Sequence, residues 1–427
     1  MAFPQLPPPS SQTALAAAAA SLLLYILFAT IRRSQHSSLP LPPGPPRRFL
    51  VGNLGDVSAD HPEEDYMRWG KEYDSDVIHV EVLGQHMIAL NSVEAASELL
   101  DRRGSNYCDR PRFALFEVMG WGLTLTFLRW GRQFKLHRSL IQKTFTSSNV
   151  KVFRPIQLHE ARKAVVDLLS HPDSWEEVTL LMTTSVIFRI AFGQEITDVS
   201  RKAIRTIHDV PWAASLKDIE AGTAPPSFMP VQKGVLEEID AVLGVFGDAT
   251  SASGPRLPTF EDRPALARLD RFLQEVHRSL PLNPLVIPHK SLRENEYHGM
   301  RIPAGSLVLA NTKAMAADPR VYQDPDTFDP DRYVSAANGG RGEPYPNGNF
   351  GFGRRKCPGN FLAMATVYMF LATLLAVYEV EMVIGPDGNL IEPQPAVTIG
   401  LGGHPAPFQC QLKLRNPALA ELLKEAA

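Results

Sequence analysis

One short segment near the C-terminus limits, more than any other, what this chain can fold into. Residues 350–359 read Phe-Gly-Phe-Gly-Arg-Arg-Lys-Cys-Pro-Gly, and the apolar stretch that follows predicts a helix over about residues 360–377. Gly353 and Gly359 allow tight backbone turns around the sulfur of Cys357. A helix N-terminus and neighbouring cations both stabilise a thiolate, so the segment indicates a loop that displays a metal-binding sulfur.

The chain has three cysteines, Cys108, Cys357 and Cys410, and none forms a C-x-x-C pair. This excludes a disulfide scaffold and a zinc module built from cysteine alone. Pro358 suits the first position of the helix that follows. A thiolate displayed in this way, with backbone N–H groups nearby, is suited to be the single axial ligand of a haem iron. The alternative, a buried free cysteine in a glycine-rich loop, does not account for the whole decapeptide.

The decapeptide matches F-x-x-G-x-R-x-C-x-G at every fixed position, and here the chain resembles the cytochrome P450 haem-thiolate monooxygenases. The resemblance implies haem b as cofactor, with its iron ligated by Cys357. It also implies that Phe350, Gly353, Arg355 and Gly359 belong to the cofactor-binding loop.

The resemblance extends to residues expected to bind the haem propionates. Residues 134–138 occupy the place of the family's W-x-x-x-R, with Phe134 in place of tryptophan, so one hydrogen-bond donor is lost. Arg138 is expected to pair with one propionate. Arg355 is the second candidate and His289 the third.

A further part of the resemblance concerns a structural ion network. Glu275 and Arg278 stand at i and i+3 of one predicted helix and match the family's E-x-x-R pair, while residues 330–333 resemble its P-E-R-F segment. Taken alone, such a pair is usually a solvated surface contact. The resemblance implies instead that Glu275, Arg278 and Arg332 form a buried ion triad that locks the loop carrying Cys357.

The rest of the body reads as a largely helical fold with small sheets. Residues 77–89 alternate apolar and polar around Gly84, which predicts a hairpin, and residues 92–102 predict a short helix capped by Ser92. Helical periodicity recurs at 134–145, 161–169, 178–192, 231–243 and 266–280, and a short strand is expected at 307–310. We therefore predict a mainly α fold with small β-sheets (α+β), with residues 50–427 forming the catalytic domain.

The N-terminus predicts a membrane anchor. Residues 13–31 form an uncharged 19-residue stretch, just long enough at ~1.5 Å per residue to cross a hydrocarbon core of about 30 Å. Residues 1–12 carry no charge, and Arg32 and Arg33 follow the stretch directly, so the leader is expected in the lumen and the body in the cytosol. The alternative, a cleaved signal peptide, calls for a basic start and a shorter apolar core.

Residues 32–49 are rich in proline and predict a stiff tether between anchor and body, with a proline-rich ligand for another protein as the alternative. The expected location is the endoplasmic reticulum membrane, crossed once. This proline-rich start and the sequence EIDAVLG resemble membrane-bound fungal members of secondary metabolism. The formal net charge of −3 gives no reason to expect a nucleic-acid partner.

The middle of the chain departs from the family pattern. Only residues 194–229 separate Gly193 from Pro230, where the family builds several helices, including the long distal helix with an A-G-x-x-T-like motif. Residues 221–223 read Ala-Gly-Thr, but the threonine follows the glycine directly and Pro225–Pro226 would break a helix there. No catalytic acid–alcohol pair is identified, and the domain is expected to be internally shortened near 194–230.

The resemblance implies a monooxygenase that uses O2 and electrons from NADPH, delivered by a separate reductase, because the chain shows no dinucleotide-binding fingerprint. The expected substrate is an apolar small molecule, a fungal secondary metabolite by the same resemblance, and residues 113–130 are expected to line its pocket. The alternative is a truncated haem-binding remnant that cannot activate oxygen.

Overall fold

The structure of the chain is a computed structural model. It describes residues 39–197, 229–244, 255–281, 283–391, 397–398, 404–405 and 408–427, together with Ala20. The expected leader (1–12), nearly all of the expected anchor (13–31) and most of the shortened region (194–230) lie outside the described residues.

Helices are the commonest regular structure in the described body. The α-helices are α2 (Pro62–Glu72), α3 (Val93–Ala96), α4 (Ala114–Val118), α5 (Arg132–Thr144), α6 (Arg154–Ser170), α7 (Trp175–Phe192), α9 (Met229–Leu243), α10 (Ala267–Ser279), α11 (Thr312–Ala316), α12 (Asn360–Val377) and α13 (Pro417–Ala426). A π-helical turn, η1 (Ser97–Arg102), continues α3, and 3-10 turns include η6 (Pro330–Tyr333) and η8 (Gly353–Arg355). The helices expected from periodicity are confirmed, with ends that differ by a few residues.

The largest sheet has four strands in the order β1-β2-β6-β3. Strands β1 (Val77–Val82) and β2 (Gln85–Leu90) form an antiparallel hairpin, β6 (Leu307–Ala310) runs parallel to β2, and β3 (His289–Lys290) closes the sheet. Two-stranded sheets are formed by β4 (Asn295–Tyr297) with β5 (Met300–Ile302), by β7 (Tyr378–Glu381) with β10 (Gln411–Leu414), and by β8 (Val397–Thr398) with β9 (His404–Pro405). The α+β prediction with small sheets is confirmed.

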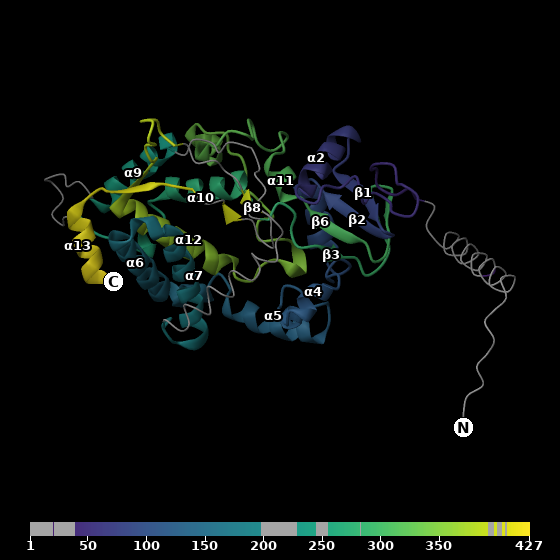
Figure 1. The fold of residues 1–427 in the computed structure, drawn as a ribbon, viewed down its shortest axis with the longest axis horizontal. Coiled ribbons are helices and arrows are strands. Elements are labelled where there is room, and N and C mark those ends of the chain that lie inside the picture. Colours follow the sequence, from purple (N-terminus) through teal and green to yellow (C-terminus); the bar gives the residue numbers. More distant parts are fainter. Residues whose placement is uncertain are drawn as a thin grey trace, which may run out of the picture.

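The sheet and the main helical core lie at opposite ends of the molecule (Figure 1). The helical core combines α6, α7, α9, α10, α12 and α13, and α12 runs through it. Among the described residues α12 is the one helix long and apolar enough to cross a membrane, but 56% of it is buried inside the protein. It is anchored by Gln157 of α6, whose amide donates to the Leu362 carbonyl at 3.0 Å and to Thr366 Oγ1 at 2.8 Å.

Local sequence signals explain several element ends. The expected hairpin turns at Leu83 and Gly84, whose φ angles of 49° and 80° are the left-handed pair of a tight two-residue turn. The Ser92 side chain caps α3 by accepting from the Ala95 N–H at 3.2 Å. The expectation for Pro358 is wrong: α12 begins at Asn360 with Gly359 as N-cap, so the proline precedes the cap.

The described part of the proline-rich segment lies along the sheet. The His79 N–H of β1 donates to the Pro43 carbonyl at 2.9 Å, and the Arg301 N–H donates to Pro40 at 2.7 Å. Proline has no N–H but keeps its carbonyl, so the segment attaches to β1 and to β5, which belong to different sheets, by accepting hydrogen bonds. The second half of the expected stiff tether over residues 32–49 therefore contacts the body through the carbonyls of Pro40 and Pro43.

Candidate functional site

The loop before α12 presents the sulfur of Cys357. The Cys357 N–H donates to the Phe350 carbonyl at 2.7 Å, which closes the loop on itself. Gly353 has a φ of 58°, and a Cβ placed there would come within 1.9 Å of the Leu100 carbonyl oxygen of η1. Only glycine fits this position, because the backbone is left-handed and a neighbouring carbonyl occupies the side-chain space. The loop is therefore held against η1 while Cys357 stays exposed.

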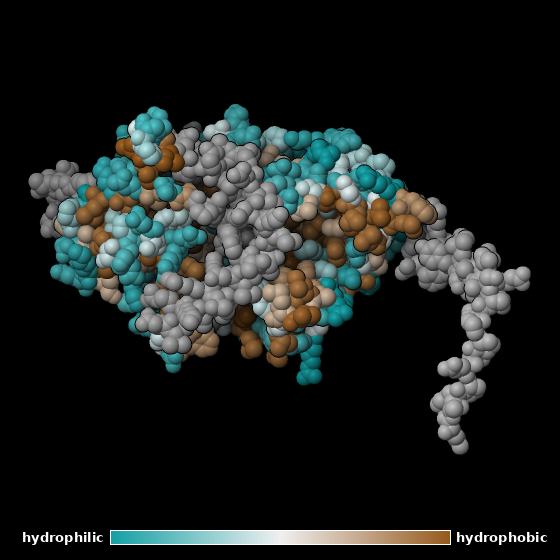
Figure 2. All heavy atoms as spheres, in the orientation of Figure 1, coloured by the Kyte–Doolittle hydropathy of each residue, from teal (hydrophilic) through white to brown (hydrophobic). Residues whose placement is uncertain are grey.

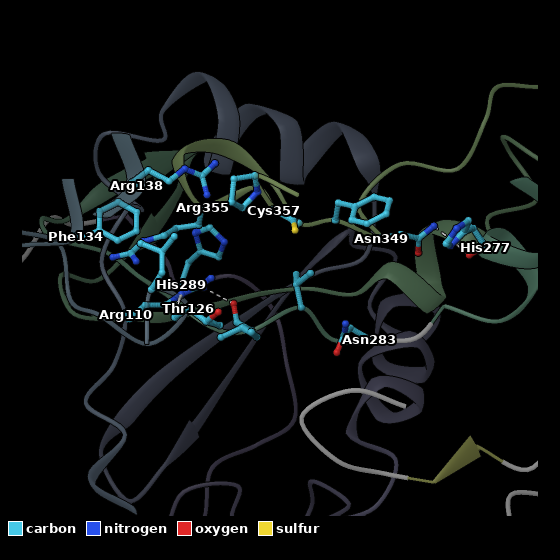
Figure 3. Close-up of a pocket in the computed structure, with 16 residues that line it drawn as sticks. Arg110, Thr126, Phe134, Arg138, His277, Asn283, His289, Asn349, Arg355 and Cys357 are labelled. Atoms are coloured by element: carbon cyan, nitrogen blue, oxygen red, sulfur yellow. Dashed lines mark hydrogen bonds between the residues drawn. The ribbon is translucent and has the colours of Figure 1, made fainter. Parts of the chain in front are cut away.

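Cys357 lies on the wall of a cavity of about 310 Å³. The lining comes from the Cys357 loop and the residue before it, from α5 and the segment before it, from α10, and from β3 with the segment before it. The residues are Arg110, Leu125, Thr126, Phe134, Arg138, His277, Asn283, Val286, Ile287, His289, Asn349, Phe350, Gly351, Arg355, Cys357 and Pro358. In Figure 3 the sulfur points into this space, with the three arginines and His289 gathered on one side of it. The cavity therefore combines one thiol with a cluster of cationic side chains.

Arg355 is the best defined of these cationic groups. Its Nε donates to the Cys108 carbonyl at 2.7 Å, while Nη1 and Nη2 are buried without a hydrogen-bond partner in the described chain. The guanidinium lies 3.6 Å from the ring centroid of Phe134, a cation–π contact. Burial lowers the pKa of Arg355 to about 10. Two unpaired guanidinium donors inside a cavity call for an anionic partner, because leaving them unpaired costs free energy.

Arg138 and His289 flank Arg355 differently. Arg138 donates through Nη2 to the Lys356 carbonyl and through Nε to Gln142, so it already supports the Cys357 loop. His289 is 2% exposed, and its Nδ1 lies 2.7 Å from the Tyr107 carbonyl. Since Nδ1 must donate to that carbonyl, neutral His289 has an acceptor at Nε2, and it can donate to an anion there only after taking up a proton.

Arg110 is a cavity residue that the sequence interpretation missed. Its side chain is 5% exposed and donates through Nη1 to the Pro288 carbonyl at 2.8 Å and through Nε to the Thr126 carbonyl at 3.2 Å. Burial lowers its pKa to about 9, and the nearby Arg355 charge contributes. No local signal identifies Arg110, because it faces the cavity only through the bridge between Asp109 and Lys290, which the fold creates.

Glu275, Arg278 and Arg332 are brought together in the protein interior, each at most 2% exposed. Glu275 Oε1 lies 2.8 Å from Arg278 Nη2 and 3.1 Å from Arg332 Nε. Two groups join them beyond the expected three: the Tyr333 hydroxyl donates to Glu275 Oε2 at 2.7 Å, and Glu343 lies 2.6 Å from Arg332 Nη1.

This network joins α10 to the chain that leads into the Cys357 loop. Arg278 and Arg332 also donate to backbone carbonyls of the preceding connection, including that of Thr327. Further along, Asn349 donates to the His277 carbonyl of α10 at 3.1 Å, just before the loop begins. The network thus fixes both the approach to the loop and the helix beside it.

The comparisons with known proteins agree with this arrangement. The family model for cytochrome P450 matches residues 42–214 and 230–412. The chain belongs to the cytochrome P450 family. Similar curated proteins include a cytochrome P450 monooxygenase of Armillaria gallica (28% identical, covering 94% of this chain and 97% of that protein) and cytochrome P450 monooxygenase 208 of Postia placenta (30%, 93% and 94%). The tryptamine 4-monooxygenase of Psilocybe cyanescens is 26% identical, covering 94% of this chain and 97% of that protein.

Cytochrome P450 enzymes are haem-thiolate monooxygenases with a cysteine-ligated iron, and this chain is one of them. The cavity fits that cofactor. It offers a thiol at Cys357 for the iron, and the unpaired guanidinium donors of Arg355 match a propionate carboxylate. Arg110 and His289 line the same cavity as Arg355, whereas Arg138 already donates a hydrogen bond to the backbone of the Cys357 loop.

Much of the cavity lining in this P450 comes from irregular segments. Leu125 and Thr126 lie in a turn, and residues 283–287 run without helical structure towards β3. Among the described residues, α-helices contribute Phe134 and Arg138 of α5 and His277 of α10 to the lining, and between α7 and α9 only residues 193–197 are described. Residues 221–223, the Ala-Gly-Thr segment that precedes Pro225–Pro226, lie outside the described residues.

Exchange of Arg355 should weaken cofactor retention, and the exposed neighbour Arg354 provides a matched control. We expect Arg355→Gln to lower haem affinity by at least about tenfold, since a charge-assisted hydrogen bond contributes roughly 1.5–3 kcal/mol. Arg354→Gln should change it by less than about twofold, because an exposed charge contributes little. Haem transfer to apomyoglobin measures both. Equal losses in the two variants would show that net positive charge matters and the cavity position does not.

Removal of Arg332 should destabilise the protein and reduce its haem content together. Arg332→Ala leaves Glu275 and Glu343 with a lost partner in a buried site, at a cost of about 3–5 kcal/mol. Arg268→Ala is the control. Its partially exposed guanidinium contacts Asp331 of η6, the turn that also carries Arg332, and this ion pair should contribute about 0.2–1 kcal/mol. Denaturant unfolding and the haem-to-protein ratio are the measurements. A stable Arg332→Ala variant with full haem and reduced turnover would contradict a structural role.

Proposed function

We propose that this cytochrome P450 binds haem b through the Cys357 thiolate and oxidises an apolar small molecule, a secondary metabolite in a fungal setting. The observation that carries the proposal is the exposed Cys357 sulfur in a cavity that also holds the unpaired donors of Arg355. When bound, the haem supplies the redox chemistry that activates O2. The chain supplies the sulfur ligand for the iron, the cationic side chains that pair with the haem propionates, and the walls that exclude water.

Each cavity residue has a distinct proposed task. Arg355 and Arg110 neutralise the propionates from inside the protein, and Arg138 steadies the loop through the Lys356 carbonyl. The Phe134 ring supports the Arg355 guanidinium from one face, which keeps its donors directed into the cavity. The tryptophan that the family has at this position could donate a hydrogen bond from its indole N–H. Phe134 lacks that donor and instead packs against Arg355, the proposed partner of the propionate.

The apolar substrate class rests on the cavity lining near Cys357. Leu125, Val286 and Ile287 contribute apolar side chains beside Thr126. Of the expected lining segment 113–130, only Leu125 and Thr126 line this cavity. The aromatic residues of that segment pack against one another, as in the stacked pair Phe116–Phe127 at 4.5 Å between ring centroids, and line a neighbouring cavity of about 300 Å³.

We further propose that the chain is held on the endoplasmic reticulum membrane by residues 13–31, with its body in the cytosol. The charge step at Arg32–Arg33 supports this orientation. Exposed apolar side chains gather where the body begins: Phe49 is 90% exposed, Leu50 79% and Leu83 66%. Figure 2 shows hydrophobic surface at this end of the molecule. Such a cluster beside the expected anchor suits contact with a lipid surface.

Membrane attachment can be tested directly. Alkaline extraction of microsomes should leave the full chain in the membrane, and protease added to intact microsomes should digest the body beyond about Leu39. A chain lacking residues 1–38 is the control and should be released at least in part by carbonate. Protection of the body from protease would place it in the lumen and overturn the orientation.

Replacement of Cys357 tests the iron ligand. The reduced carbonyl complex of the wild-type protein should show the red-shifted Soret band of thiolate ligation, and Cys357→Ser should abolish it, because a neutral hydroxyl is a poor substitute for a thiolate. Cys410→Ser is the matched control and should keep the band. Retention of the band in Cys357→Ser would exclude Cys357 as the ligand.

The shortened middle of the chain favours inefficient oxidation. The comparison with the Armillaria gallica protein extends over 505 aligned positions, more than the 427 residues of this chain, so the alignment places extra residues in that relative. Just before the shortened region, Phe192 of α7 is 67% exposed and Ile187 51%. These observations support a segment, present in that relative and missing here, that would cover part of α7. They also favour the second candidate, a haem-binding remnant with lost oxygen activation.

Coupling efficiency separates the two candidates. In a system reconstituted with an NADPH-dependent reductase, we expect low product yield and high hydrogen peroxide release per NADPH consumed, because oxygen chemistry needs delivered protons and excluded water. A full-length fungal relative under the same conditions is the control. No NADPH consumption above the protein-free rate would support the remnant, whereas tightly coupled oxidation would show that residues within this chain perform the missing task.

A further inference from the structure

Three metal-ligand side chains lie on one face of the β1–β2 hairpin, away from the haem cavity. Glu81 of β1 is paired directly with His86 of β2, and His79 stands two residues before Glu81 on the same strand. Because side chains alternate along a strand, and directly paired residues share a face, all three project to the same side of the sheet. The sequence pattern is His-x-Glu on one strand and His on the next.

The ligand atoms of the three side chains lie close to one another. His79 Nε2 lies 2.9 Å from His86 Nδ1, and His86 Nδ1 lies 3.7 Å from Glu81 Oε2. One ligand atom from each residue falls within 4.8 Å of the other two. Two ligands at about 2.0–2.1 Å from a tetrahedral zinc ion are roughly 3.3 Å apart, so small side-chain rotations bring this set to coordination geometry.

We propose that His79 Nε2, His86 Nδ1 and the Glu81 carboxylate form a Zn²⁺ site, with solvent as the fourth ligand. Two imidazoles and one carboxylate are a donor set suited to zinc, whereas Mg²⁺ and Ca²⁺ prefer oxygen ligands throughout. His79 is 5% exposed, while the side chains of His86 and Glu81 are 28% and 22% exposed. The site therefore has a buried floor and an opening through which an ion and a water molecule reach it.

The surrounding structure holds the ligands in place. The opposite face of β1 packs Ile78 and Val80 into a buried cluster with Tyr66 and Trp69 of α2. On the ligand face Ile88, the residue paired with His79, is fully buried. Backbone positions of the hairpin are thus fixed before an ion arrives, which reduces the conformational entropy lost on binding.

One cation occupies part of this site in the metal-free protein. Arg47 Nη1 contacts Glu81 Oε2 at 2.5 Å, and the Arg47 side chain is 50% exposed. Zinc must displace this contact, which is inexpensive because an exposed ion pair contributes little. Arg301 adds a second nearby positive charge that opposes the ion. Affinity should therefore rise when Arg47 is replaced by a neutral residue.

Zinc binding at this place would affect how the proline-rich segment is held. Arg47 belongs to that segment, and the His79 N–H donates to the Pro43 carbonyl within it. Asn53 bridges the same region, accepting from the Glu81 N–H at 3.1 Å. Ion binding would therefore fix the side-chain face of β1 and release one contact of the segment, linking metal to the chain that leads towards the N-terminus.

A second histidine–carboxylate group in the described chain provides a matched comparison. His61, Glu63 and Glu64 also bring ligand atoms within 4.8 Å of one another. There, however, Lys313 lies 3.7 Å from Glu63 and 2.6 Å from Glu64, so an ammonium already neutralises the two carboxylates. With one imidazole and a fixed internal cation, this group should bind zinc more weakly than the hairpin site.

In the test, Zn²⁺ is titrated into haem-loaded full-length protein, and binding is measured by isothermal titration calorimetry. We expect one high-affinity ion per chain, no competition from Mg²⁺, and a tetrahedral visible spectrum with Co²⁺ as probe. His86→Gln and Glu81→Gln should each weaken binding by at least about tenfold. Arg47→Gln should strengthen it, and His61→Gln should leave it unchanged.

His86→Cys keeps a zinc ligand and should retain binding, which separates ligand loss from misfolding, and thermal denaturation without metal checks each variant. Unchanged affinity in both His86→Gln and Glu81→Gln, or loss of the ion in His61→Gln, would overturn the proposal. A wild-type protein that binds no zinc would also overturn it and would leave a plain hydrogen bond between the two imidazoles.

Discussion

Glu275 carries a carboxylate where no water reaches it, and the rest of the site depends on how that charge is compensated. It accepts from Arg278, Arg332 and Tyr333 and from one backbone N–H, so both oxygens are saturated by donors. A buried charge left unpaired costs several kcal/mol, so the chain around it has little freedom to rearrange. The arginines in turn bind carbonyls of the connection before the Cys357 loop, which transmits this rigidity to the sulfur.

The cavity beside that loop has the opposite electrostatic character. Burial depresses the pKa of both Arg110 and Arg355, and the charge of Arg355 lowers the pKa of Arg110 further. Two cations in one poorly solvated space are unfavourable unless an anion joins them. In the proposed complex the propionates of a haem would supply that negative charge, so cofactor binding would relieve a cost that the folded polypeptide carries.

How far the sequence could predict this site depends on the distance over which each signal acts. The sulfur of Cys357, the hairpin turn at Gly84 and the helical periodicity of α12 were predicted, because backbone preferences and apolar spacing act over a few residues. The grouping of Glu275 with Arg332 was expected only through the resemblance to cytochrome P450. Spacing in the chain alone gives no reason to pair residues so far apart.

The sequence by itself determined the glycine-rich Cys357 loop, the α+β character and the family, since these follow from local patterns and from a match that covers most of the chain. The tertiary structure decided which polar groups share a space. Arg110 reaches the cavity because the neighbouring Asp109 forms a bridge with Lys290, in the strand of His289. The proline-rich segment attaches to β1 because the Pro43 carbonyl accepts a hydrogen bond from His79. His79 and His86 meet because of the register between β1 and β2. Such contacts arise from pairing between distant segments, and no local propensity specifies them.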